Sequence, residues 1–176
     1  MSIQLTTELC RIFNIRYPIV LAGMAGLPNM AGLVAAVSNA GGLGTLGAAY
    51  MTPDDLRKAI HEIRQLTQKP FAVNLFSTQV SDNITRIKEV QHELNKMRSE
   101  LGISQASDDS VSSPNYFEEQ FAVILEEQVP VISTAFGQLP RALMQQAKSA
   151  GIKIVSMVTT VHEAIQAEQA GCDAIV

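Results

Sequence analysis

The sequence predicts an α/β protein in which a parallel sheet is covered by helices. Two features predict it: near-continuous apolar runs that suit strands buried on both faces, and an Ala-Gly pair that recurs where a helical pattern gives way to a strand. The pairs are Ala40-Gly41, Ala150-Gly151 and Ala170-Gly171. Glycine readily takes the left-handed conformation that ends a helix, so each pair predicts the end of a helix-to-strand connection.

Six strands are expected, starting near residues 18, 42, 71, 129, 153 and 173. The apolar runs that carry four of them are Pro18–Ala22, Phe71–Phe76, Val129–Phe136 and Ile152–Val158. The other two, Gly42–Ala48 and Asp173–Val176, follow Ala-Gly pairs. Helices are expected between the strands, and two have marked starts. Thr52 precedes Pro53 and two acids, and Thr160 has capping-box spacing to Glu163.

The spacing of the strands predicts one domain over residues 1–176 with an insertion at about 78–128. Within the insertion Asn83–Leu101 has a helical pattern, and Gly102–Tyr116 is rich in serine. Such a polar segment is either a solvated loop or a lid over a binding site. An eight-stranded βα barrel needs about 250 residues. We therefore expect a chain truncated after about six strands, because the last strand begins only at Asp173.

Composition argues against several classes of partner. The net charge is −4, aromatic residues make up 5% and Trp is absent, so neither a basic face nor stacking platforms for nucleic acid are supplied. The uncharged segment 17–53 resembles a membrane span in hydropathy, but it holds seven of the eleven glycines and several turn formers, which exclude a membrane helix. Cys10 and Cys172 match no metal or redox spacing, and a cytoplasmic location is the simplest expectation.

Two positions are candidates for ligand contact. Gly23-Met24 follows the first strand, where glycine would let a flat ligand approach the backbone; a tight turn with Met24 filling the core explains it equally well. Asn74 lies in an apolar strand and needs a hydrogen-bond partner, which is either a structural group or a ligand.

Other motifs are weaker candidates. Gly42–Gly47 matches G-x-G-x-x-G literally, but it follows a helix and enters a strand, the reverse of the dinucleotide-binding order. His61, His92 and His162 fall in helical segments away from the carboxyl ends of strands, where barrel enzymes keep their active sites. The sequence offers no metal cluster and no hydrolase triad.

Three segments taken together resemble the nitronate monooxygenase family, formerly called 2-nitropropane dioxygenases. They are Tyr17–Gly26, Ser38–Thr45 and Lys69–Leu75. The resemblance implies a (β/α)8 TIM barrel that binds FMN and no metal. It implies flavin contacts at Gly23, Met24 and Asn74, with Thr134 and Ser156 lining the same barrel mouth. Leu21 departs from the family pattern, which commonly has Gln there.

The same resemblance implies the reaction. Family members oxidise alkyl nitronates, such as propionate 3-nitronate, with dioxygen to a carbonyl compound and nitrite, which serves detoxification in the cytoplasm. The partners implied are the nitronate and dioxygen, without nucleic acid or membrane, and a homo-oligomer remains open. The family's catalytic histidine lies beyond Val176, so we expect little turnover from this chain alone.

Two alternatives remain open at this point. An FMN-dependent enoyl-acyl-carrier-protein reductase would share the Gly-Met turn and the Asn-containing strand, whereas the long insertion favours the monooxygenase. A non-catalytic remnant of the fold would explain the missing histidine. Flavin absorbance in the purified protein would separate the remnant from both enzymes.

Overall fold

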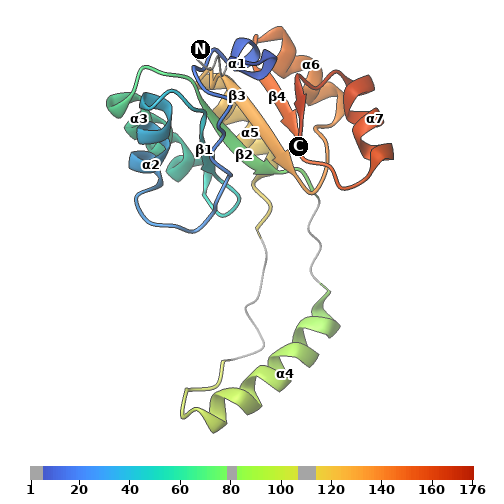
Figure 1. The fold of residues 1–176 in the computed structure, drawn as a ribbon. Coiled ribbons are helices and arrows are strands. Elements are labelled where there is room, and N and C mark those ends of the chain that lie inside the picture. Colours follow the sequence, from blue (N-terminus) through green and yellow to red (C-terminus); the bar gives the residue numbers. More distant parts are fainter. Residues whose placement is uncertain (1–5, 79–82, 107–113) are drawn as a thin grey trace, which may run out of the picture. The chain divides into compact units, whose positions relative to one another are not determined.

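The computed structural model describes residues 6–78, 83–106 and 114–176. The chain divides into two compact units. Unit 1 comprises Met1–Thr78 and Tyr116–Val176, and unit 2 comprises Gln79–Asn115. Figure 1 gives the helices and strands their labels. In chain order the elements are α1 (Glu8–Phe13), α2 (Met30–Asn39), β1 (Gly44–Gly47), α3 (Pro53–Leu66), β2 (Phe71–Phe76), α4 (Ile84–Glu100), α5 (Phe117–Glu126), β3 (Val131–Ala135), α6 (Arg141–Ser149), β4 (Lys153–Ser156), α7 (Val161–Ala170) and β5 (Ala174–Ile175).

Unit 1 is built on one parallel sheet. Its five strands, counted over the described residues, follow the order β1-β2-β3-β4-β5, so every strand pairs with its neighbours in sequence. A helix lies between each pair of consecutive strands, as in βα units. The expected α/β class with a parallel sheet is confirmed, and strands near residues 42, 71, 129, 153 and 173 are all present.

The first expected strand, Pro18–Ala22, is not formed as a ladder strand. This segment touches β1 only through isolated parallel bridges, Val20 to Leu43 and Met24 to Leu46. The two bridges are four positions apart along this segment, from Val20 to Met24, but three positions apart along the β1 side, from Leu43 to Leu46. The register therefore cannot continue from one bridge to the next. The hydrogen-bond ladder is therefore interrupted at Ala22 and Gly23. The apolar pattern predicted the position of the segment beside β1 but not this mismatch.

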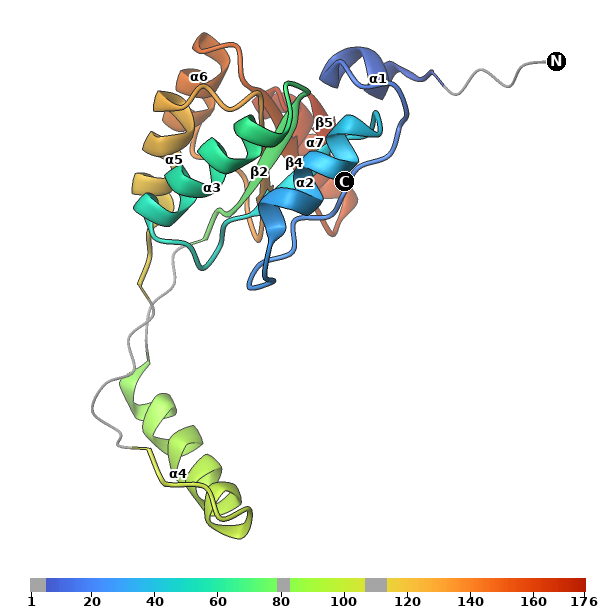
Figure 2. The same ribbon diagram turned by 90° about the vertical axis from the view of Figure 1, so that its left-hand side faces the viewer.

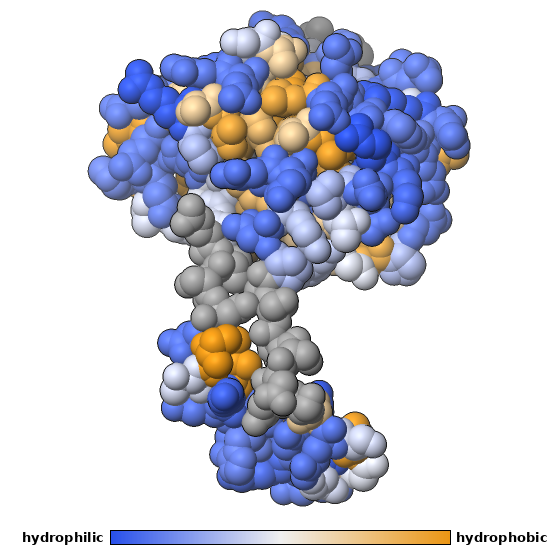
Figure 3. Space-filling model, turned by 180° about the vertical axis from the view of Figure 1, so that it is seen from behind, coloured by the Kyte–Doolittle hydropathy of each residue, from blue (hydrophilic) through white to orange (hydrophobic). Residues whose placement is uncertain are grey.

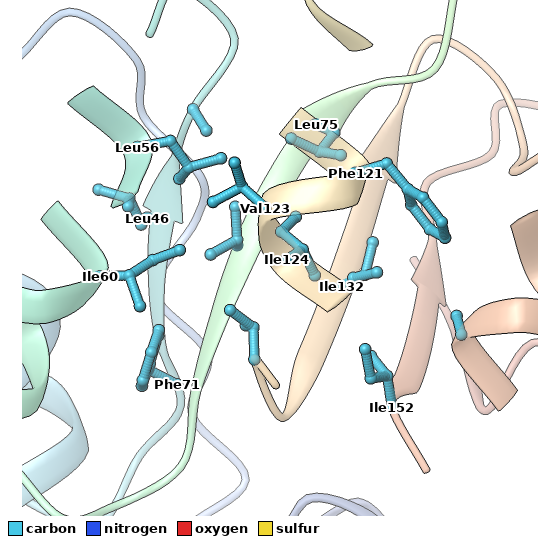
Figure 4. Close-up of a cluster of buried hydrophobic side chains, with 14 of the residues drawn as sticks. Leu46, Leu56, Ile60, Phe71, Leu75, Phe121, Val123, Ile124, Ile132 and Ile152 are labelled. Atoms are coloured by element: carbon cyan, nitrogen blue, oxygen red, sulfur yellow. The ribbon is translucent and has the colours of Figure 1, made fainter. Parts of the chain in front are cut away.

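The sheet has two faces: the face with Val73, Leu75 and Ile132 is called the outer face, and the face with Ala72 and Val131 is called the inner face. The outer face carries the main hydrophobic core. Strand side chains that are essentially unexposed, such as Val73, Leu75 and Ile132, pack there against helix residues. Figure 4 shows Phe121, Val123 and Ile124 of α5 among them, with further residues from α3. Apolar burial of this kind supplies the largest favourable term in folding.

The inner face of the sheet is covered only near the amino ends of the strands. There Phe13 of α1 packs on Leu43, Ala72 and Val131 as a second buried cluster. Figure 2 shows α1 on one side of the sheet and α5 and α6 on the other. The remaining inner-face residues toward the carboxyl ends are left to form the site described below.

The expected helix ends are confirmed. The Thr52 side chain accepts a hydrogen bond from the backbone N–H of Asp55, and Thr160 with Glu163 forms a complete capping box on α7. The three glycines of the Ala-Gly pairs all have positive φ, between 75° and 98°. Each pair thus ends its helix in the way the repeat predicted.

Unit 2 contains α4, which agrees with the helical pattern of Asn83–Leu101. Asn83 caps this helix by accepting from the backbone N–H of Arg86. Residues 107–113 of the serine-rich segment lie outside the described residues. The expected insertion at about 78–128 differs at its far end, because α5 (Phe117–Glu126) buries Phe121 and Ile124 in the core of unit 1.

Seen from behind, the surface of unit 1 is mainly hydrophilic and surrounds a smaller hydrophobic area (Figure 3). In the described part of the chain, none of the helices has the length and apolar character needed to cross a membrane.

Candidate functional site

A cleft of about 450 Å³ opens on the inner face of the sheet. None of its lining side chains, all of them among the described residues, carries a charge. Most are apolar, and a few carry hydroxyl or amide groups. They are Val20, Leu21, Ala22, Gly23, Leu43, Thr45, Ala72, Asn74, Phe76, Ser133, Thr134, Ala135, Phe136, Val155, Met157 and Val176. A cleft with this lining suits a flat, largely apolar ligand that is held by a small number of hydrogen bonds.

Asn74 is the central polar group of the cleft. It is 6% exposed, and its Nδ2 donates to Ser133 Oγ over 2.8 Å. The two residues are direct register partners on β2 and β3. Side chains alternate between the two faces of a strand, so Asn74 lies on the face opposite that of Val73 and Leu75. An amide on the inner face of the sheet can hydrogen-bond to a ligand in the cleft while it keeps one structural hydrogen bond.

Gly23 lies against the Asn74 side chain. A Cβ atom on Gly23 would fall 2.5 Å from Asn74 Cβ, closer than real Cβ contacts allow. Only glycine lets the segment after the first bridge approach β2 this closely. The structure therefore brings two of the predicted site residues together at one wall of the cleft.

Met24 follows Gly23 but is not among the residues that line the cleft. It is half-buried, packs against the main hydrophobic cluster, and its backbone bridges to Leu46. Of the two interpretations of the Gly-Met turn, the core-filling one fits the side chain of Met24, whereas ligand approach at Gly23 stays a prediction.

Thr134 and Ser156 are brought to each other rather than to Asn74. Their hydroxyl oxygens lie 3.3 Å apart, and both residues are 1% exposed. Thr134 lies two positions after Ile132, and Ser156 lies two positions after Ile154. Residues two apart in a strand share a face, so both hydroxyls lie on the outer face, where Ile132 and Ile154 pack in the core. Thr134 is among the lining residues, but its hydroxyl is bonded to Ser156.

Two residues of the cleft, Thr45 and Ser133, were not predicted as site residues from the sequence. Both share the inner face with Asn74, and the period of two along β1 and β3 is the signal that could have identified them. Thr45 Oγ1 is buried and, within the part of the chain that the structure describes, has no hydrogen-bond partner. An unpaired buried hydroxyl costs about 1–3 kcal/mol, which a polar ligand atom would offset.

Aromatic side chains form the rim above these polar groups. Phe76 lies edge to face with Phe136 at 4.9 Å and with Tyr50 at 6.1 Å between ring centroids. Phe136 is 71% exposed and has a φ of 60°, unusual for a bulky residue. Backbone strain of this kind is common at binding sites. The rim thus offers flat apolar surface at the carboxyl ends of β2 and β3.

Titratable groups with shifted pKa values lie outside the cleft. Burial raises the pKa of Glu127, but hydrogen bonds from Arg57 and His61, with the charges of His61 and Arg64, outweigh it and hold the pKa below its ordinary value. Burial raises the pKa of the Cys172 thiol. No group of three or more metal-ligating side chains occurs in residues 6–78, 83–106 and 114–176.

The cleft can therefore bind and orient a ligand, but its described lining supplies no acid or base. Thr45, Asn74 and Ser133 offer hydrogen bonds, and Gly23 offers close approach to the backbone. These features fit the isoalloxazine ring of a flavin, which is flat, mostly apolar and polar along one edge. The unpaired Thr45 hydroxyl is the observation that most directly indicates a missing polar partner.

Comparisons with known proteins identify the family of the chain. The family model described as nitronate monooxygenase matches residues 6–176. A probable nitronate monooxygenase of Staphylococcus saprophyticus is 36% identical over 98% of this chain, and one of Staphylococcus aureus is 38% identical over 96%. The matched regions are 48% and 47% of those proteins, so the chain spans about half the length of these curated relatives.

Solved structures give the same picture. A nitroalkane oxidase from Streptomyces ansochromogenes matches 96% of this chain and 47% of its own, with a TM-score of 0.81 and 34% identity. FabK from Thermotoga maritima matches 97% of this chain and 43% of its own, with a TM-score of 0.72 and 32% identity. Both are TIM-barrel enzymes, which confirms the barrel fold expected from the sequence, here with about half of the barrel.

Proposed function

Because this chain belongs to the nitronate monooxygenase family, we propose that it forms part of the flavin-ring pocket of an FMN-dependent enzyme that oxidises alkyl nitronates. The products would be a carbonyl compound and nitrite, with dioxygen as the final electron acceptor. The single observation that carries this proposal is the placement of Asn74 beside Gly23 at an uncharged cleft of about 450 Å³.

Each cleft residue has a definite part in this proposal. FMN, when bound, would supply the electron acceptor that the side chains lack. Gly23 would let the ring approach the backbone, and Asn74 would hydrogen-bond to the polar edge of the ring. Phe76 and Phe136 would shield the ring from water. Met24, Thr134 and Ser156 would act by supporting these residues, since their side chains pack or bond elsewhere.

Substrate and location belong to the same proposal. A small nitronate such as propionate 3-nitronate and dioxygen would be the reactants, and removal of the toxic nitronate in the cytoplasm would be the biological role. The uncharged lining supports a small organic substrate. The free thiols of Cys10 and Cys172 are compatible with a reducing compartment.

The test is reconstitution of the purified chain with FMN, followed by flavin fluorescence and by oxygen uptake with a nitronate. We expect flavin binding that falls strongly in Asn74→Leu, which keeps the side-chain size but removes both hydrogen-bonding groups. We expect little oxygen uptake, because the described cleft residues supply no base. A chain that leaves the fluorescence of FMN unchanged would disprove the flavin site. Rapid turnover would disprove the absence of a base.

Enoyl-thioester reduction is the second candidate activity. The likeness to FabK, with 32% identity, is nearly as high as that to the nitroalkane oxidase, with 34%. The two activities differ in their electron source, since a reductase must take hydride from NADH or NADPH. Oxidation of NADPH with crotonyl thioester, compared with oxygen uptake with a nitronate, would separate them in a protein of the relatives' full length.

A further inference from the structure

The orientation of the Asn74 amide is determined by its neighbours. On one side Nδ2 donates to Ser133 Oγ over 2.8 Å. On the other side lies Gly23, where a Cβ atom would fall 3.0 Å from Asn74 Oδ1. The amide nitrogen is therefore directed at β3, and the carbonyl oxygen, which accepts no hydrogen bond from the described residues, is left for a ligand.

We propose that Ser133 is a positioning residue that fixes the Asn74 amide so that it presents its carbonyl oxygen, and not its NH2 group, to the ligand in the cleft. This inference rests on the proposed flavin site, because it concerns which edge of the ring Asn74 recognises. Ser133 suits the role because it is the direct register partner of Asn74 on the neighbouring strand.

The orientation matters because the two ends of an amide select opposite partners. A carbonyl oxygen accepts only from an N–H group, and oxidised isoalloxazine has a single ring N–H, at N3. An NH2 group would instead select a ring carbonyl oxygen or an unprotonated ring nitrogen. Ser133 would thus determine that the N3–H edge is recognised, without itself touching the flavin.

Neighbouring hydroxyls cannot replace Ser133. Thr134 is the next residue on β3, but its hydroxyl is bonded to Ser156 on the opposite face of the sheet. Thr45 shares the inner face, yet its Oγ1 has no partner among the described residues, so it does not hold the amide. Removal of the Ser133 hydroxyl would leave the Asn74 amide free to rotate.

The test compares two ring analogues that carry no phosphate, lumiflavin and its N3-methyl derivative, which lacks the N–H. Binding to the whole chain is measured by quenching of flavin fluorescence. We expect the wild-type chain to prefer lumiflavin by roughly tenfold, the range of one neutral hydrogen bond, and Ser133→Ala to reduce that preference to within about twofold. A general loss of stability would weaken the binding of both analogues alike, so it would not change the ratio of their affinities.

Matched variants isolate the role of Ser133. Ser38→Ala removes a buried hydroxyl of α2 that bonds to Pro70 and Gly44 and not to Asn74, and it should keep the full preference. Ser133→Thr keeps a hydroxyl and should also keep it. In an Asn74→Leu background, Ser133→Ala should cause no further change, since Ser133 acts only through Asn74.

A measurement without ligand covers the case in which Ser133→Ala folds poorly. In the wild-type chain the Asn74 side-chain NH2 signals, assigned by their loss in Asn74→Asp, should exchange slowly with water. Rapid exchange would contradict the bond to Ser133 and overturn the inference.

Other outcomes separate the inference from the proposed function. Equal wild-type binding of both analogues, or a preference that survives in Ser133→Ala, would overturn the role of Ser133 and leave the flavin site standing. Equal binding is also the result if Ser133 donates to Oδ1 and Asn74 presents its NH2 group. A wild-type chain that binds neither analogue would overturn the flavin site and, with it, this inference.

Discussion

The two faces of the sheet in unit 1 differ in what they contribute. The outer face carries fully buried aliphatic side chains under a layer of helices, whereas the inner face carries polar groups and exposed apolar residues around a cleft. Val73 and Asn74 are adjacent in β2 yet belong to opposite faces. Strand alternation thus separates the residues that stabilise the fold from those that can bind a ligand within the same short strand.

The largest contrast should come from truncating one residue on each face. Ile132→Ala, on the outer face and 0% exposed, should lower the free energy of unfolding by about 2–5 kcal/mol, because it removes buried methyl groups and leaves a cavity. Met157→Ala, on the inner face and 51% exposed, should cost less than about 1 kcal/mol. Urea denaturation measures both, and equal costs would refute the division between the faces.

On the inner face, Gly23→Ala should have a large effect on ligand binding, in contrast to the small effect of Met157→Ala on stability. The new Cβ would overlap Asn74, so the side chain or the segment must move, and affinity for FMN should fall roughly tenfold. Fluorescence titration is the measurement. Combined with Asn74→Gly, which removes the clashing Cβ together with the rest of the side chain, Gly23→Ala should weaken binding much less; an undiminished loss in the double variant would contradict the mechanism.

Thr45→Val should show the stability cost of a polar inner face. It replaces a buried hydroxyl that lacks a partner among the described residues, so the free energy of unfolding should rise by about 1 kcal/mol while flavin affinity falls. The matched control is Thr67→Val. Thr67 Oγ1 donates to Asn39 and accepts from the backbone N–H of Lys69, so that variant should lose stability. Thermal unfolding of ligand-free protein should therefore show shifts of opposite sign.

The smallest effect should come from the ion pairs that join α3 to the end of α5. The folded-state pKa of Glu127 lies below its ordinary value of 4.5, so the stabilisation is present above that pH and lost as the pH falls through the lowered pKa. Glu127→Gln should cost about 1 kcal/mol at pH 7, because its partners are partly exposed. The difference from wild type should shrink in acid, and Glu126→Gln should have less effect, because the Glu126 side chain is 61% exposed.

Much of the fold could be predicted from local pattern. The apolar run Phe71–Phe76 gave the bounds of β2, and Thr160 with Glu163 gave the start of α7, because both depend on neighbouring residues alone. The Pro18–Ala22 segment could not be assigned correctly. Its departure from strand geometry depends on a one-residue mismatch against β1, which is a tertiary property.

The site was predicted in part for a related reason. Gly23 and Asn74 were identified, and the structure brings them together. The family resemblance implies Thr134 and Ser156 at the barrel mouth, but the alternation of side chains along their strands directs their hydroxyls to the outer face. Ser133 is the residue before Thr134 in β3. Counting alternation from Ile132 would have selected it, whereas the lack of a partner for Thr45 could be seen only in three dimensions.

The mismatch between the two isolated bridges has a consequence for how this protein tolerates change. Ala22 and Gly23 line the cleft between the two bridges, where neither residue forms a bridge of its own to β1. A ligand that hydrogen-bonds to the backbone at these positions does not depend on the polarity of their side chains. A saturation scan there should thus rank substituents by bulk rather than by polarity, and the exchange of Gln for Leu21 relative to the family pattern should leave ligand recognition intact.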